Sequence, residues 1–164
     1  MMKNCQLYTV LLMVLALVGC SSPKHFYQGP ELSADERVTI WSPTPMLNVK
    51  RINDMGITLG VLNLGDRVYA KQGKNTITAE SKGDSTSWSS SGYTTTSTRV
   101  YRGTFSADLL AGHVYLLEST GGYLTLSDLG NTFTLPEDSL VNDDGYDEAL
   151  EEARKIGTRV KLYK

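Results

Sequence analysis

The pattern of apolar and polar positions beyond residue 36 is that of short β-strands. Runs rich in Val, Ile, Tyr and Thr alternate apolar with polar residues, as at Val38 and Ile40 and again at Leu124 and Leu126. This period of two is typical of strands with one buried face. Gly, Asn and Asp separate the runs at short intervals. The pattern predicts a mainly β, single β-sandwich-like domain of about seven to nine short antiparallel strands.

The C-terminal part departs from this period. Between residues 146 and 156 apolar residues fall at helical spacing, with acidic residues in the first turns and Lys155 near the end. Gly157 follows, where a glycine can end a helix. We therefore expect one amphipathic helix near 146–156. Residues 158–164 alternate again, which predicts a final strand that returns to the sheet.

The N-terminus has the three parts of a secretory signal. A positive start with Lys3 precedes an apolar stretch from Leu7, and small residues precede Cys20. The apolar stretch is shorter than the roughly 20 residues of a transmembrane helix, so we expect residues 1–19 to be removed.

Residues 17–20, Leu-Val-Gly-Cys, resemble the lipobox of bacterial lipoproteins. The resemblance implies cleavage before Cys20, a thioether-linked diacylglycerol on its sulfur and an acyl chain on its nitrogen. An ordinary signal peptide with a chance cysteine is the alternative. Two acyl chains already hold a protein stably on a membrane. Ser21 replaces the Asp typical of inner-membrane retention, which implies transport to the outer membrane.

Composition sets further bounds. Without its first 19 residues the chain of 164 keeps 145, enough for one domain with a sizeable core. Cys5 leaves with the signal and Cys20 is acylated, so the mature chain has no free thiol and no disulfide. Removal of Lys3 leaves 15 Lys and Arg against 18 Asp and Glu. This acidic balance argues against a nucleic-acid partner.

The segment after the anchor reads as a flexible tether. Residues 20–35 are polar, contain two prolines and a glycine, and show no sustained period. Such a segment could span on the order of 40–50 Å when extended. We therefore expect an acylated cysteine and tether over 20–35 and a β-rich globular domain over 36–164.

The stretch 81–99 is rich in Ser and Thr and contains Trp88 and Tyr93. One interpretation is a long hairpin or mobile loop whose small polar residues stay solvated, with Trp88 able to fold back on the core. The other is a binding loop in which Trp88 and Tyr93, with Tyr101, contact an envelope protein or a glycan.

The sequence offers little for metal binding. Asn142, Asp144, Gly145 and Glu151 match a calcium-loop template, but the first ligand position falls on Leu140. We expect the acidic residues to cap and complement the helix instead, and no metal.

Catalysis is also poorly supported. His25 lies in the expected tether, and His113 lies at a strand start where it would pack a turn. The nucleophile motif G-x-S-x-G is absent from the sequence. We therefore expect no enzyme activity.

Two stretches resemble small uncharacterised proteobacterial lipoproteins. Residues 26–41 read FYQGPELSADERVTIW, and Phe105, Gly112 and Tyr115 fit a late F-x-x-x-x-x-x-G-x-x-Y pair. The layout over residues 26–128 is also loosely similar to PEGA-type modules, small β-sandwiches of bacterial envelope proteins. The resemblance implies a structural or binding role in the envelope.

Together these features predict an outer-membrane-anchored lipoprotein that faces the periplasm. Its expected role is a non-catalytic binding or scaffolding module for another envelope component, with residues 81–99 as the contact. Two alternatives stay open: an envelope hydrolase acting on peptidoglycan or lipid through His113, and a passive spacer. No cofactor is expected beyond the acyl groups on Cys20.

Overall fold

The computed structural model describes residues 24–44, 46–56, 67–88, 94–120, 122–136 and 144–163. The predicted signal segment and Cys20 lie outside these ranges. The elements, in chain order, are β1 (Lys24–His25), β2 (Arg37–Trp41), β3 (Leu47–Ile52), β4 (Met55–Gly56), β5 (Arg67–Lys71), β6 (Gly73–Trp88), β7 (Thr94–Leu109), β8 (Val114–Thr120), β9 (Tyr123–Gly130), α2 (Asp144–Ile156) and β10 (Thr158–Arg159).

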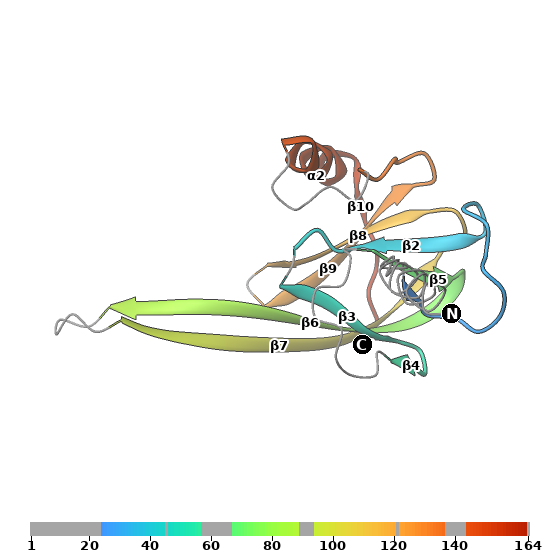
Figure 1. Cartoon of the computed structure of the whole chain (residues 1–164). Helices are drawn as coiled ribbons and strands as arrows, with labels where there is room; N and C mark the ends of the chain where they lie inside the picture. Colours follow the sequence, from blue (N-terminus) through green and yellow to red (C-terminus); the bar gives the residue numbers. More distant parts are fainter. Residues whose placement is uncertain are drawn as a thin grey trace, which may run out of the picture.

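These strands form two sheets, which confirms the mainly β, sandwich-like prediction (Figure 1). One sheet has the order β1-β5-β2-β8-β9-β10, and the other has the order β4-β3-β6-β7. Two features differ from the expectation of short antiparallel strands. The pairs β1–β5 and β2–β8 are parallel, and β6 and β7 each run for 16 residues.

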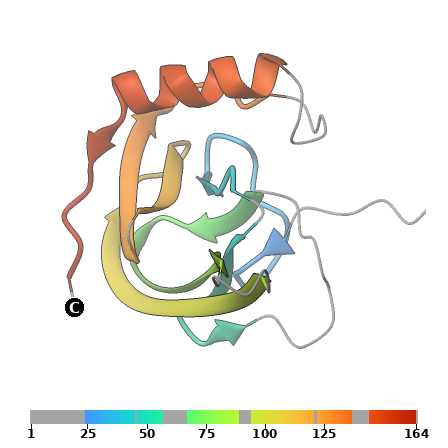
Figure 2. The same cartoon turned by 90° about the vertical axis from the view of Figure 1, so that its left-hand side faces the viewer.

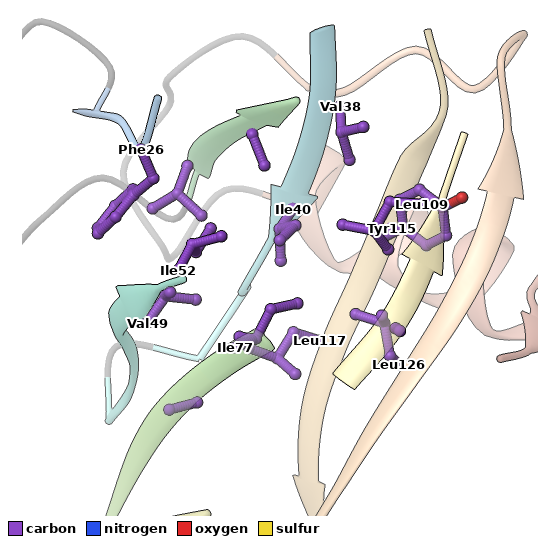
Figure 3. Packing of buried hydrophobic residues seen from close by; sticks show 14 of the residues in the cluster. Phe26, Val38, Ile40, Val49, Ile52, Ile77, Leu109, Tyr115, Leu117 and Leu126 are labelled. Atoms are coloured by element: carbon purple, nitrogen blue, oxygen red, sulfur yellow. The ribbon is translucent and has the colours of Figure 1, made fainter. Parts of the chain in front are cut away.

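The core lies between the two sheets, because alternate residues of each strand point inward. On β2, Val38 and Ile40 are fully buried, as the period of two predicts. They meet Ile77 of β6 and Leu117 of β8 in one cluster of buried side chains (Figure 3). Burial of each such side chain contributes about 1.5–3 kcal/mol to stability.

Helix α2 covers the other face of the larger sheet (Figure 2). Its Tyr146 and Ala153 are buried in a second cluster with Trp41 of β2. The Tyr146 hydroxyl donates a hydrogen bond to the carbonyl of Pro43 at 2.9 Å. The predicted helix is therefore confirmed. No helix in the described ranges is long and apolar enough to cross a membrane.

The chain after α2 returns to the sheets, as predicted. Strand β10 pairs with β9, and the Val160 amide then donates to the Leu126 carbonyl at 2.8 Å. Further on, Tyr163 forms an isolated antiparallel bridge to Ser106 of β7. The returning segment thus contacts both sheets.

The tether predicted over residues 20–35 is wrong from Lys24 onward. Strand β1 pairs with β5, and the Phe26 amide donates to the Tyr69 carbonyl at 2.8 Å. The side chain of Phe26 joins the core cluster (Figure 3), and the next residue, Tyr27, is also buried. Two paired residues and two aromatics are too few to produce a period in the sequence, yet they bury enough surface to fix the segment.

Candidate functional site

The β6–β7 hairpin extends well past the rest of the molecule (Figure 1). Its two strands pair without a register shift from Gly73 opposite Leu109 to Trp88 opposite Thr94. Strand β3 accompanies β6 only as far as Ser81, and the last contact on that side is the Lys82 amide with the Met46 carbonyl. We call the remaining six pairs, residues 83–88 and 94–99, the arm. At about 3.3 Å per residue the arm is about 20 Å long.

The arm corrects the prediction of a loop over 81–99. Every described residue in this stretch belongs to a strand, so the alternative of a long hairpin is confirmed. Thr is a good strand former, but a Ser/Thr run has no apolar alternation from which a strand could be recognised. Trp88 occupies the last pair of β6, and Tyr93 lies outside the described residues.

Polar pairs across the two strands anchor the arm at its base. The hydroxyls of Thr78 and Thr104 lie 3.0 Å apart, and Arg102 donates to the Glu80 carboxylate at 2.8 Å. Lys50 of β3 approaches the same carboxylate at 4.0 Å. A two-stranded ribbon is marginally stable by itself, so these pairs and the core beneath them hold the arm's register.

The Glu80 carboxyl at the base of the arm has a lowered pKa. The hydrogen bond from Arg102 lowers the pKa of Glu80, and the positive charge of Lys50 lowers it further. Partial burial acts in the opposite direction, because it disfavours the charged form. Glu80 therefore stays ionised at neutral pH between two cations.

Three exposed apolar side chains lie at the base of the arm. Tyr101 is 42% exposed, and neighbouring Val100 is 54% exposed. The Tyr101 ring lies over the β8–β9 turn, where a Cβ added to Gly122 would be 3.2 Å from it. Tyr123, the next residue, is 78% exposed. The sequence predicted Tyr101 as a contact residue but gave no signal for Tyr123, which only folding brings near it. Val100 precedes Tyr101 in the sequence and points to the opposite face of β7.

His113 has a carboxylate partner that its sequence neighbourhood does not suggest. Its Nδ1 lies 2.9 Å from the Asp128 carboxylate on β9, and its ring stacks on Tyr115. The His113 amide also donates to the Leu110 carbonyl at 3.3 Å, so the predicted turn contact is present as well. Asp128 accepts a further bond from the Gly130 amide at 2.8 Å.

This pair borders an open cavity of about 510 Å³. The rest of the lining comes from β9 and from the segment around β10. Among the described lining residues, Thr158 is the only one with a hydroxyl group. A histidine held by a carboxylate can act as a base, but nucleophilic catalysis also needs an activated nucleophile within hydrogen-bond reach.

His25 has a structural place rather than a position on a tether. It lies on β1, where its Nδ1 is 2.8 Å from the Tyr27 hydroxyl and its ring packs 5.4 Å from the ring of Tyr69. Glu31 approaches the other ring nitrogen at 3.9 Å. The imidazole helps to hold the first strand against β5.

Residues 144–151 do not form the calcium-loop arrangement. Residues 144–151 belong to α2, so Asp144 and Gly145 lie in a helical turn rather than a ligand loop. Leu140 and Asn142 lie outside the described residues. Within the described ranges, no group of three or more His, Cys, Asp or Glu residues is placed to hold a metal ion.

Comparison with protein-family models, with curated proteins and with solved structures found no match to this chain.

Proposed function

We propose that this chain is a lipid-anchored envelope protein that binds another envelope component, a protein or a glycan, through the β6–β7 arm and its base. In this proposal Cys20 carries the acyl chains and the domain faces the periplasm from the outer membrane. The observation that supports it is the hairpin itself: 16 paired positions, of which the outer six pairs have no other strand beside them in the described structure.

The base of the arm adds an apolar surface to this projecting ribbon. Tyr101 lies against the β8–β9 turn next to exposed Tyr123, and Val100 exposes its side chain on the opposite face of β7. Aromatic residues with a half-exposed ring are typical of binding surfaces, since they bury much area with few rotatable bonds. A passive spacer has no use for a projecting arm with exposed aromatics at its base.

In-cell photo-crosslinking tests this proposal. A photoreactive residue is placed at Tyr101 or Trp88, and the control probe replaces Glu152, which is exposed on α2. We expect a discrete adduct from the arm positions and none from the helix, with the protein recovered in the membrane fraction. Equal adducts from both places, or none from either in a membrane-bound protein, would contradict arm binding.

Acylation is tested separately. The Cys5→Ser variant should incorporate labelled fatty acid, and the Cys20→Ser variant should not. Equal incorporation by Cys20→Ser would contradict the anchor without bearing on the arm.

The His113–Asp128 pair supports a hydrolase acting on peptidoglycan or lipid as a second candidate. Asp128 would hold the His113 imidazole so that its second ring nitrogen faces substrate in the cavity. Purified protein incubated with peptidoglycan or with phospholipid vesicles should then release product, and the His113→Ala variant should not. Unchanged product release in a folded His113→Ala variant would contradict this role.

A further inference from the structure

We propose that the arm binds its partner by strand addition: an extended, acidic segment of a partner protein pairs with the outer edge of β7. This inference rests on the proposed function, binding through the arm, and deepens it by stating how the partner is held and what its chemistry is.

The structure identifies which backbone groups of β7 point away from β6. The Ser106 amide donates to the Tyr163 carbonyl at 2.8 Å, and the Tyr163 amide donates to the Ser106 carbonyl at 2.9 Å. Both backbone groups of Ser106 therefore point outward. On the other strand, Thr76, the partner of Ser106, also turns its carbonyl outward, where it accepts from the Asn53 amide at 2.7 Å.

This orientation repeats along the hairpin. In an antiparallel pair, inward and outward backbone groups alternate, and the β6–β7 ladder has no register shift. The even-numbered residues of β7 from 96 to 104 therefore present their amides and carbonyls to the outer edge, as Ser106 does. They form a regular row with the spacing that an added strand requires.

The row has no strand beside it in the described structure. Strand β7 is the last strand of its sheet, and the bridge to Tyr163 occupies this edge at Ser106. Residues 96–102 are exposed. The returning C-terminal segment thus already occupies the position of a fifth strand at one point, and the open edge continues from there into the arm.

The edge lacks most of the devices that usually protect an exposed strand. Natural edge strands carry proline, charged residues (above all lysine) or a bulge, or are kept very short, and here Arg99 and Arg102 are the charged residues present. Residues 94–107 contain no proline and no lysine, and their pairing with β6 is regular. A long, regular and open edge of this kind is the form used in strand-addition recognition.

Charge determines which partner fits. Residues 94–107 include Arg99 and Arg102 and no acidic residue. Side chains on an added strand would lie about 4.5–5.5 Å from those of β7, so a carboxylate there would pair with Arg99, while Arg102 stays bonded to Glu80. A second copy of β7 would instead bring arginines toward arginines, which favours an acidic partner segment over self-pairing.

Synthetic peptides test this proposal on the full-length protein. The probe is an alternating Glu-Thr peptide, and the controls are a Lys-Thr peptide and a Glu-Thr peptide with every second amide N-methylated. Amide hydrogen exchange at Thr96, Thr98 and Val100 is the readout. We expect the acidic peptide to slow exchange at these amides about tenfold and the two controls to leave it unchanged.

A variant pair separates backbone from side-chain recognition. Thr98→Pro removes an outward amide but no bond to β6, and proline is tolerated where an edge amide faces solvent. Thr98→Ala keeps the amide. We expect affinity for the acidic peptide to fall about tenfold in Thr98→Pro and to change less than about threefold in Thr98→Ala.

Each contrary outcome has a distinct meaning. Strand addition is wrong if the acidic peptide gives no protection, if the Lys-Thr peptide protects equally, or if Thr98→Pro binds as tightly as the parent. Protection that appears without peptide and grows with protein concentration would replace the partner by a second copy. If the arm is needed for crosslinking but Thr98→Pro captures the same adduct, strand addition fails and the proposed function stands.

Discussion

At the scale of single residues, the base of the arm combines an ion cluster with exposed aromatics. Glu80 lies between Arg102 and Lys50 and is 8% exposed, whereas Tyr101 on the same hairpin is 42% exposed. The carboxylate stabilises the register of the strands, and the aromatic ring is free to contact a partner. The two residues should therefore respond differently to substitution.

Glu80 should make the stability of the domain depend on acid pH. The pKa of Glu80 in the folded state lies below the ordinary glutamate value of 4.5, so its stabilising effect is full above that pH and is lost as pH falls through the folded pKa. The Glu80→Gln variant should melt at a lower temperature than the parent at pH 7, and the gap should close below pH 4.5. Thermal unfolding followed by circular dichroism measures this gap. Glu152→Gln, on the exposed face of α2, is the control, and a gap that stays constant with pH would contradict the role of Glu80.

Tyr101 should affect binding more than stability. Because its ring is largely exposed, Tyr101→Ala should cost about 1 kcal/mol or less in the free energy of unfolding. The same variant should weaken capture of the arm's partner several-fold. Leu110→Ala is a matched control, because Leu110 is 55% exposed just after the end of β7 and lies away from the arm. Equal capture by both variants would show that the aromatic base is not part of the contact.

At the scale of elements, the β6–β7 hairpin consists of an inner part and the arm, and we expect the two to have different roles. The inner part contributes Ile77 and Phe105 to the core, whereas no other strand of the described structure pairs with the arm. Stability should reside in the inner part and recognition in the arm.

Shortening the hairpin should distinguish the role in stability from the role in recognition. Replacing residues 84–98 with Asn-Gly joins Gly83 to Arg99, which already face each other, through a two-residue turn. We expect the free energy of unfolding to change by no more than about 1 kcal/mol, and partner capture to be lost. Ile77→Ala, in contrast, should cost about 2–5 kcal/mol, because Ile77 is fully buried. Denaturant unfolding compares the two. A shortened hairpin that unfolds the domain would contradict the division.

At the scale of the whole molecule, the first described residues belong to the domain. Strand β1 extends the larger sheet, and Phe26 enters the core that both sheets share. The folded unit therefore begins before residue 36, whereas the sequence predicted that it begins at residue 36.

Phe26→Ala tests this boundary. Because the Phe26 side chain is only 6% exposed, its truncation should cost about 3–5 kcal/mol in the free energy of unfolding. Glu31→Ala, in the same segment, removes a side chain that is 70% exposed and should cost about 0.5 kcal/mol or less. Urea unfolding of the two variants measures both values. If Phe26→Ala cost as little as Glu31→Ala, the segment would be a tether after all.

The parts that the sequence predicted are those with a local period. Val38 and Ile40 on β2 and the apolar stripe of α2 repeat at the spacing of their own element, so their structure could be read from neighbouring residues. The arm and the His113–Asp128 pair could not. The Ser/Thr run has no apolar period, and His113 meets Asp128 only because β8 and β9 pair. Contacts between distant residues depend on register, which the alternation within one strand does not determine.

The pairing of β1 with β5 also sets how far the protein can travel from its anchor. In a chain held through Cys20, as proposed, three residues lie between Cys20 and Lys24, and the four steps from one to the other span at most about 14 Å. The tether expected from sequence would have spanned on the order of 50 Å. Since swept volume grows with the cube of reach, the search volume of the domain is roughly fortyfold smaller, and its local concentration at the membrane surface is correspondingly higher. Under the proposed anchoring the domain would be confined to a thin layer at the bilayer, and the arm would have to reach any partner farther away.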